Sequence, residues 1–518
     1  MLQYQIFSEN EWVYPDTEIT ATGKADLHVA RGGDVCFQVL LDRMLTAGER
    51  VSASFARPGC SVQLYQLIPA HVSENSGIKT HTTKDYEEVK HFVTRRAPFD
   101  VYDVTKPVDM GVEAGRAAFF VRIDVAKDAP AGAEQGVLTL CIGEETLALP
   151  VSLCVYSVQL PSLRDASFHM INWLYYDRIA KQHSVEPYSA DYMRVLRHYM
   201  ENQLDMRNDY LMIPSGEPVR DGEGRVVDFD FSHAETVGNL ALEMGFTKIL
   251  GGFSIHWLEW KSPDLFLLWD TDIEVKSLEG YRQLKLYFTR ANECIERNGW
   301  RACYQQCIMD EPQFYNSAAY RIVGAICRKC IPGVVINDPV ESTDLAGGLD
   351  VWVVKQAVYE KYIEDYRKLQ EMGEEIWIYT CGFPANKVMN RVMDLPLNAS
   401  RLPMWMCYKY NCPGFLHWGY HCHNEEERRD TCYKVRERRF PAGNAHVVYL
   451  EKDGPIYGVR GHAQRTGAQD YELLRLLGER NREKALAIVD KVCRTFDDYE
   501  ADAAALDDAR RELLEALG

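Results

Sequence analysis

The sequence predicts a multidomain fold, with an N-terminal all-β sandwich followed by a (β/α)8 barrel of the TIM type and a C-terminal extension. Three observations predict this fold: short alternating strands near the N-terminus, eight strand patterns interspersed with helical stretches, and a final hairpin pattern followed by helices. The 518 residues are enough for roughly three domains of about 150 residues. We place the domains at residues 1–160, 165–440 and 441–518.

The N-terminal domain is predicted from apolar residues that alternate with polar ones between Gly, Pro and Asp. The clearest strands span residues 34–40, 118–123, 136–140 and 147–151, and their spacing is typical of a β-sandwich. No residues of this domain indicate chemistry, so we expect an accessory module. Residues 160–163 indicate a linker to the next domain.

The central domain is predicted as a barrel because strands alternate with helices, as a (β/α)8 fold requires. The predicted strands span residues 167–175, 210–214, 248–252, 302–309, 333–337, 350–355, 375–380 and 414–418. The predicted helices span residues 189–203, 231–244, 278–298, 318–330 and 358–372. In this fold the chemistry takes place at the C-terminal ends of the strands.

The C-terminal extension begins with a hairpin pattern. Two strands are predicted at residues 445–450 and 456–460, with Asp453-Gly454 as the turn. Residues 470–477 and 481–517, rich in Ala, Leu, Glu and Arg, predict two helices that pack on the barrel exterior.

Composition limits the partners. The net charge of −18 argues against nucleic acid and anionic membranes, and no run approaches the roughly 20 apolar residues of a membrane span. The 29 Tyr and 10 Trp are compatible with sugar binding, although most such rings pack in cores. Fifteen Cys and no signal-peptide pattern predict a cytoplasmic protein with reduced thiols, with a removed leader and a homo-oligomer left open.

Asp310-Glu311-Pro312 is the most informative motif, and it holds the one Asp-Glu step of the chain. Adjacent carboxylates at the exit of a buried strand repel each other, so their pKa values tend to separate. That separation suits acid/base chemistry on a bond that requires a proton donor and an anion, most commonly a glycosidic bond. The structural alternative is a solvated turn or a helix N-cap.

Other polar and aromatic residues lie at or near predicted strand ends. Asp338, Lys355, Gln356 and Thr380 are expected to converge with the acidic pair, because the strand ends meet at one face of a barrel. The candidate substrate-binding residues are Tyr379, Trp418, Asn337, His169, His256 and Trp257. Each of these could instead be a structural residue or part of the core.

No metal or cofactor is predicted. Cys327 and Cys330 form a lone pair, and the denser cluster of His421, Cys422 and His423 is better explained by reduced thiols than by tetrahedral zinc. No phosphate-binding glycine loop and no Gly-x-Ser-x-Gly motif is present.

Neighbouring carboxylates suit substrate-assisted hydrolysis, in which the 2-acetamido oxygen of the sugar attacks the anomeric carbon. One carboxylate then orients the acetamido N–H, and the other protonates the leaving oxygen and later activates water. Both groups act on one side of the reacting centre. A nucleophile and an acid on opposite faces would normally come from different strands.

Several segments resemble glycoside hydrolase family 123, whose known members include β-N-acetylgalactosaminidases. The resemblance covers residues 165–478 and is carried by residues 309–312, 414–420 and 441–443, by Gly454, Arg460 and residues 470–472, and by residues 174–179 and 186–208. It implies a β-sandwich before a catalytic barrel and retention of configuration. The substrate is then a terminal amino sugar of a glycan or glycoconjugate. The sequence departs from the known members at Gly461-His462, where Leu-Glu is expected.

The same resemblance implies that Asp310 polarises the acetamido group and that Glu311 is the acid/base, with Tyr379 as a partner of the acetamido group. One alternative is a glycosidase with another sugar specificity that recruits a further carboxylate such as Asp338. Another is a non-catalytic carbohydrate-binding protein.

Overall fold

The computed structural model describes residues 2–424 and 430–518, and the chain forms two compact units. The β-rich unit comprises Met1–Phe168, Cys381–Tyr410 and Gly419–Gly518, and the barrel unit comprises His169–Thr380 and Asn411–Trp418. The C-terminal residues thus belong to the same unit as the N-terminal sheets. The three domain boundaries taken from the sequence stay a prediction.

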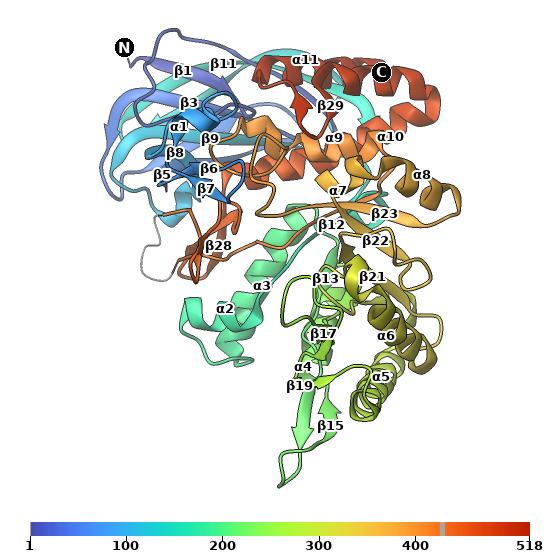
Figure 1. Ribbon diagram of the computed structural model, residues 1–518. Helices are drawn as coiled ribbons and strands as arrows, with labels where there is room; N and C mark the ends of the chain where they lie inside the picture. The colour runs from blue at the N-terminus through green and yellow to red at the C-terminus, as the bar shows by residue number, and fades with distance from the viewer. Residues whose placement is uncertain (1, 425–429) are drawn as a thin grey trace. The chain divides into compact units, whose positions relative to one another are not determined.

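The β-rich unit contains two sheets, which confirm the predicted strand-rich N-terminal region (Figure 1). One sheet has five antiparallel strands, in the order β1 (Tyr4–Ser8), β3 (Asp34–Leu45), β9 (Gly115–Val125), β5 (Cys60–Val72) and β8 (Phe99–Pro107). The other has four strands, in the order β2 (Ala25–Arg31), β11 (Glu145–Gln159), β10 (Gly132–Ile142) and β4 (Val51–Phe55). Only the pairing of β2 with β11 is parallel in these two sheets.

The two sheets share one hydrophobic core. Alternate residues of β9, such as Phe119 and Val121, are fully buried, and so are Leu138 of β10 and Leu149 of β11. The period of two in the sequence places these side chains on one face of each sheet. Burial of apolar surface at about 25 cal/mol per Å² makes this core the main source of stability for the sheets.

The C-terminal segment differs from its prediction. The hairpin β27 (Val448–Glu451) and β28 (Gly454–Tyr457) is present, but residues 459 and 460 begin helix α10 (Val459–Val492), which kinks at Asn481. The predicted second helix is interrupted by β29 (Cys493–Thr495) and β30 (Asp498–Tyr499) before α11 (Ala503–Leu517). Asp502 accepts a hydrogen bond from the Ala504 N–H, so it caps a separate helix.

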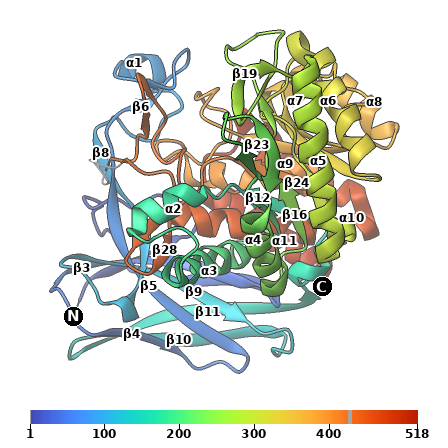
Figure 2. The same ribbon diagram turned by 90° about the horizontal axis from the view of Figure 1, so that it is seen from below.

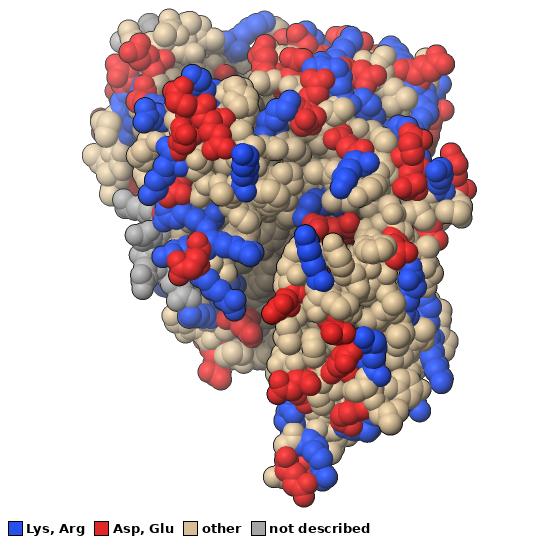
Figure 3. Space-filling view, in the orientation of Figure 1, with Lys and Arg blue, Asp and Glu red and all other residues tan. Residues whose placement is uncertain are grey.

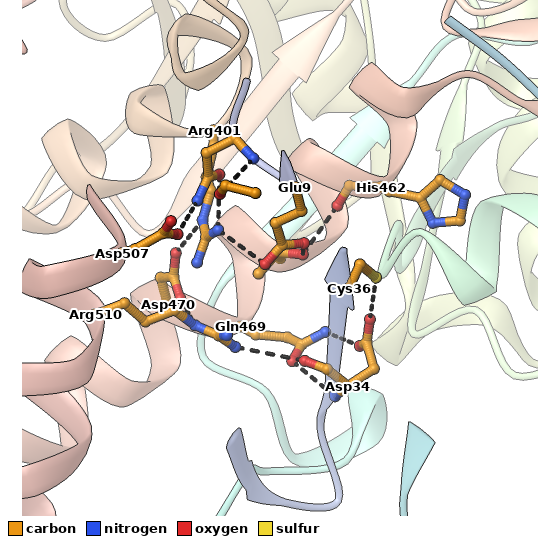
Figure 4. Close-up of polar contacts among 12 residues, drawn as sticks. Glu9, Asp34, Cys36, Arg401, His462, Gln469, Asp470, Asp507 and Arg510 are labelled. Carbon is orange, nitrogen blue, oxygen red and sulfur yellow. Dashed lines mark hydrogen bonds and ion pairs between the residues drawn. The ribbon is translucent and has the colours of Figure 1, made fainter. Parts of the chain in front are cut away.

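A buried network of charges joins distant parts of the β-rich unit (Figure 4). The Arg401 Nε donates to Asp470 Oδ2 at 2.7 Å, and a second Arg401 nitrogen lies 3.2 Å from Glu9 Oε1. The Arg510 Nε donates to the other Asp470 oxygen at 3.0 Å. Burial raises the pKa of Glu9 even with Arg401 beside it. The network therefore ties the N-terminal segment to α9 (Leu402–Lys409), α10 and α11.

Neighbouring arginines on α11 allow a matched test of this network. Arg510→Met leaves the buried Asp470 without one partner, and we expect the free energy of unfolding to fall by about 3 kcal/mol. Arg511→Met removes an exposed ion pair with Asp508 and should change it by less than about 1 kcal/mol. Urea unfolding measures both variants, and equal losses would contradict a structural role for the network.

The barrel unit contains eight parallel strands in one sheet, confirming a barrel-like sheet consistent with the TIM type. Along the sheet the order is β12-β24-β23-β22-β21-β20-β16-β13, and the Asp209 N–H donates to Met170 O, which brings the start of β13 back to β12. The strands are β12 (His169–Asn172), β13 (Tyr210–Met212), β16 (Lys248–Gly251), β20 (Tyr304–Gln306), β21 (Val335–Val340), β22 (Val351–Lys355), β23 (Glu375–Thr380) and β24 (Gly414–His417).

Helices accompany these strands and lie outside them in Figures 1 and 2. They are α2 (Tyr176–His183), α3 (Ala190–Asp205), α4 (Ser232–Met244), α5 (Leu278–Asn298), α6 (Ser317–Cys330), α7 (Gln356–Lys361) and α8 (Ile363–Glu371). The single helix predicted at residues 358–372 is divided at Tyr362, whose backbone leaves the helical region. A hairpin, β14 (Glu217–Arg220) and β15 (Val226–Asp230), was not predicted.

Two strand boundaries differ from the prediction in ways that affect the site. β20 ends at Gln306 instead of residue 309, and β21 continues to Val340 instead of ending at residue 337. β21 thus contains Pro339, which lacks only a backbone N–H. β20 pairs with β21 no further than Ile336, so a proline is tolerated where β21 pairs with β22 alone.

Charged side chains of both signs lie side by side on the face drawn in Figure 3, so the net charge of −18 is not gathered in one patch there. Within residues 2–424 and 430–518, every helix is too short or too polar to cross a lipid bilayer.

Candidate active site

The acidic pair lies in a loop after β20, where the backbone makes a left-handed turn. Glu311 has a φ of 48°, and its N–H donates to Pro339 O at 3.1 Å. In an extended strand, consecutive side chains point to opposite faces. A left-handed residue breaks this alternation, and for a non-glycine residue such a conformation is a strained feature typical of functional sites. Since β20 ends at Gln306, Asp310 and Glu311 both lie outside the strand, and the turn at Glu311 allows the two carboxylates to reach the same side of the chain.

Asp338 holds the segment that leads into the pair. Its fully buried carboxylate accepts hydrogen bonds from the Ile308 N–H at 2.9 Å, the Met309 N–H at 3.3 Å and the Tyr320 O–H at 2.7 Å. Burial raises the pKa of Asp338 well above its ordinary value. Asp338 was predicted to lie at a strand end as a further carboxylate for catalysis. Its position inside β21 and its three donors make it a structural support instead.

Glu311 is the centre of a cluster that joins three strand ends. The Tyr379 O–H, from β23, donates to Glu311 Oε1, and the Lys355 Nζ, at the end of β22, lies 3.3 Å from the same oxygen. Lys355 also forms an ion pair with Glu341, which follows β21. The Lys355 ammonium lies 5.6 Å from the centre of the Tyr379 ring, within range of a cation–π contact. A hydroxyl and a cation thus fix one oxygen of Glu311.

Asp310 has a different environment. Its side chain is exposed to solvent, but the surrounding protein atoms, and then the charge of Glu311, raise the pKa of Asp310 to about 8. Lys355 opposes this rise. The raised pKa favours the protonated form of Asp310 in the free protein. The sequence-based roles had Asp310 charged.

Two of the predicted substrate contacts lie away from the pair. His169 is the first residue of β12, opposite the first residue of β24, and its Nδ1 lies 2.8 Å from Asp209 Oδ2. It therefore occupies the N-terminal end of its strand, whereas barrel chemistry takes place at the C-terminal end. Asn337 lies inside β21, is 1% exposed and donates to Gln305 Oε1 at 2.9 Å. These positions favour structural roles for His169 and Asn337, and a substrate contact by either residue stays a prediction.

His256 and Trp257 lie beside the acidic segment. His256 belongs to β17 (Ile255–His256), and the preceding Ile255 N–H donates to Ile308 O at 3.2 Å. Among the described residues the buried His256 Nε2 has no hydrogen-bond partner. Trp257 is half-buried and follows directly. These positions are compatible with the predicted contacts.

Trp418 and Tyr379 lie at the C-terminal ends of two paired strands, β24 and β23. Trp418 comes directly after β24, is half-buried, and its carbonyl accepts a hydrogen bond from the Tyr175 O–H at 3.1 Å. Tyr379 is 3% exposed, so most of its ring is packed and its hydroxyl is committed to Glu311. Tyr379 therefore supports the acid/base candidate directly, and a contact with the acetamido group stays a prediction.

Three residues near the strand ends were not predicted from the sequence. Glu341 was missed because the fifth strand was ended too early, at residue 337. Trp173 follows β12 and Phe253 follows β16, and their rings pack edge to face with centres 5.4 Å apart. Aromatic residues directly after a barrel strand are the signal that would have identified this pair.

The cysteine and histidine clusters show no sign of a metal centre in the part of the chain that the structure describes. No group of three or more His, Cys, Asp or Glu side chains is arranged there to hold a metal ion. The 15 Cys all lie among the described residues, and no disulfide is found there.

The family model described as glycoside hydrolase 123, catalytic domain, matches residues 173–477, which is more than half of the chain. The chain belongs to glycoside hydrolase family 123. It is therefore a glycoside hydrolase, and its substrate class is carbohydrate. No curated protein matches the sequence.

Solved structures agree with this membership at the level of fold. The chain is similar to a family 123 glycoside hydrolase from Clostridium perfringens, described in a study of glycolipid glycan hydrolysis, with 13% identity and a TM-score of 0.75 over 100% of this chain and 97% of that one. Two other solved structures match too weakly to carry an argument. A GH10 xylanase from termite gut has 12% identity and a TM-score of 0.37, with 87% of this chain and 100% of that chain covered. An endo-β-1,4-mannanase from Thermotoga petrophila also has 12% identity and a TM-score of 0.37, with 60% of this chain and 78% of that chain covered.

The support by Asp338 can be tested with a variant of the same size. Asp338→Asn keeps the volume but replaces one acceptor oxygen with an NH2 group. Because the Ile308 N–H lies within hydrogen-bond distance of both oxygens, it then faces a donor in either orientation of the amide. We expect the protein to lose about 1–3 kcal/mol of stability, and the Ile308 amide to exchange hydrogen faster. The control Asp344→Asn alters an exposed carboxylate that accepts from Ser317. Unchanged exchange at residues 308 and 309 in Asp338→Asn would refute the supporting role.

Proposed function

We propose that this family 123 member is a retaining exo-β-N-acetylgalactosaminidase that uses substrate-assisted catalysis through an oxazoline intermediate. The observation that carries the proposal is the left-handed turn that presents Asp310 and Glu311 as neighbours, with Glu311 bound by Tyr379 and Lys355. Two carboxylates from one turn act on one side of the reacting centre. This arrangement suits a mechanism in which the substrate supplies its own nucleophile.

In the first step, the acetamido oxygen bonds to the anomeric carbon while the glycosidic C–O bond breaks. Glu311 delivers its proton to the leaving oxygen, and the Asp310 carboxylate accepts a hydrogen bond from the acetamido N–H as the oxazolinium forms. In the second step, Glu311 takes a proton from water, which opens the oxazoline at the anomeric carbon. Two displacements at this carbon retain its configuration.

The surrounding residues have supporting roles in this proposal. Tyr379 and Lys355 orient Glu311, and the charge of Glu341 balances that of Lys355. Trp418, His256 and Trp257 remain our candidates for substrate contacts. The structural relative from Clostridium perfringens is linked to glycolipid glycan hydrolysis, which supports a sugar at the end of a glycan as the substrate.

A second candidate function is a glycosidase with another sugar specificity and an enzyme nucleophile. Asp338 cannot supply that nucleophile, because its carboxylate is buried. Glu341 is the carboxylate that favours this reading, since it lies at the neighbouring strand end and shares Lys355 with Glu311. The two mechanisms differ in whether the substrate needs its acetamido group.

A pair of matched substrates separates the mechanisms. We expect hydrolysis of an aryl 2-acetamido-β-galactoside to exceed that of its 2-hydroxy analogue by at least about 10³-fold, because only the first carries the nucleophile. Glu311→Gln should lose about 10²–10⁴-fold on the acetamido substrate, which assigns the activity to this site. The exposed Glu371→Gln is the control and should match the wild type. Equal rates on the two substrates would exclude substrate assistance.

The raised pKa of Asp310 predicts a pH dependence. The proposed role needs the carboxylate, so kcat/KM, which reports the free enzyme, should fall as pH drops below about 8, where Asp310 becomes protonated. The direction is a loss of activity on the acid side, because a raised pKa keeps the proton to higher pH. Carbon-detected NMR titration, with Asp310→Asn to assign the signal, measures the same group. A midpoint near the ordinary aspartate value of about 3.9 would contradict the account.

A further inference from the structure

Large apolar side chains are exposed on two loops next to the acidic pair. One loop follows β17 and carries the half-buried Trp257 with the exposed Leu258 and Trp260, and the other follows β20 and carries the exposed Phe314 and Tyr315. Their exposed fractions are 52% for Leu258, 45% for Trp260, 67% for Phe314 and 52% for Tyr315. We name these five residues the aromatic rim. Contiguous exposed apolar surface on a folded protein commonly marks a binding site.

The two loops are attached to each other and to the acidic segment. The Asn316 Nδ2 donates to Ser262 O at 3.2 Å, which links the end of one loop to the other. The N–H groups of Ser254 and Ile255 both donate to Ile308 O, just before the pair. Phe314 follows Glu311 closely in the chain. Both loops that carry the aromatic rim are therefore attached to the segment that bears the carboxylates.

The rim is held by local hydrogen bonds. Gln313 and Asn316 cap each other around the short helix Phe314–Asn316, with the Gln313 N–H 2.8 Å from Asn316 Oδ1. The Ser262 N–H donates to Glu259 O in the other loop. Within the loops, the rings of Trp257 and Trp260 lie 5.0 Å apart at 90°, and those of Phe314 and Tyr315 lie 6.0 Å apart at 79°. Edge-to-face pairs of this kind fix ring orientation while leaving ring surface exposed.

We infer that the aromatic rim is a subsite for the sugar ring on the leaving-group side of the scissile bond. The inference rests on the proposed function, because it takes Asp310 and Glu311 as the place where the bond breaks. Sugar C–H faces pack on aromatic rings while their hydroxyls need polar partners. The rim offers both, since exposed Glu259 and Lys261 alternate with Trp260 and Leu258.

Other occupants fit these observations less well. The centre of a stable protein interface is depleted of charged residues, whereas Glu259 and Lys261 lie among the apolar members of the rim. A net charge of −18 disfavours an anionic lipid surface. A single pyranose ring matches a small patch of paired rings next to a cleavage site.

The test compares a disaccharide with a monosaccharide in the full-length protein. The substrate is a disaccharide with N-acetylgalactosamine β-linked to galactose, and free N-acetylgalactosamine is the competitor that cannot reach the rim. Trp260→Ala and Phe314→Ala should each lower kcat/KM for the disaccharide by about tenfold. The inhibition constant of N-acetylgalactosamine should stay within about twofold. Tyr281→Ala removes an exposed ring of α5 and serves as the control, with no change in either value.

Calorimetry in the Glu311→Gln background gives a second readout that does not need turnover. Disaccharide binding should weaken about tenfold with either rim substitution, and monosaccharide binding should not change. The inference would be overturned, with wild-type hydrolysis intact, by equal losses of affinity for both sugars or by no loss for the disaccharide. It would also be overturned by a change in sedimentation that reveals a second copy of the protein bound at the rim. If the wild type cleaves no 2-acetamido glycoside, the proposed function itself fails and the subsite falls with it.

Discussion

The candidate site depends on the hydrogen bonds that the Asp338 carboxylate accepts from Ile308 and Met309. β20 ends at Gln306, and although the Cys307 N–H still donates to Gly251 O of β16, the N–H groups of Ile308 and Met309 bond to the Asp338 side chain and not to a neighbouring strand. A buried N–H without a partner costs free energy comparable to a lost hydrogen bond, and a side chain from β21 supplies the acceptor instead. Because the Asp338 carboxylate takes the place of a neighbouring strand as the hydrogen-bond acceptor, the backbone can turn at Glu311. Without it, Asp310 and Glu311 would continue the alternation of the strand.

The second constraint is electrostatic. Three carboxylates, those of Asp310, Glu311 and Glu341, lie around the single Lys355 ammonium. Burial among protein atoms, and then the charge of Glu311, raises the pKa of Asp310, whereas Lys355, which contacts Glu311 and Glu341 directly, opposes that rise. An N–H donor from a substrate would favour the Asp310 carboxylate again. In the proposed mechanism, the acetamido N–H of the substrate is that donor.

Much of the barrel could be predicted because its strands and helices are local patterns. Residues 375–380 and 278–298 form the predicted strand and helix, since one is a continuous apolar run and the other a long amphipathic stretch after Ser277. The ends of β20 and β21 could not be predicted, because they depend on the long-range bonds of Asp338. That error concealed Glu341 and misplaced Asn337. The pairing of Glu9 with Arg401 also depends on the folded chain, because no local pattern links residues so distant in sequence.

The most direct test of the central claim is a crystal structure with a galactose-configured thiazoline, a stable mimic of the cyclised oxazoline intermediate. We expect the thiazoline ring nitrogen within hydrogen-bond distance, about 2.6–3.2 Å, of the Asp310 carboxyl group, and Glu311 near the anomeric carbon. A thiazoline that binds elsewhere, or whose nitrogen faces Glu341 or solvent, would contradict the proposed mechanism.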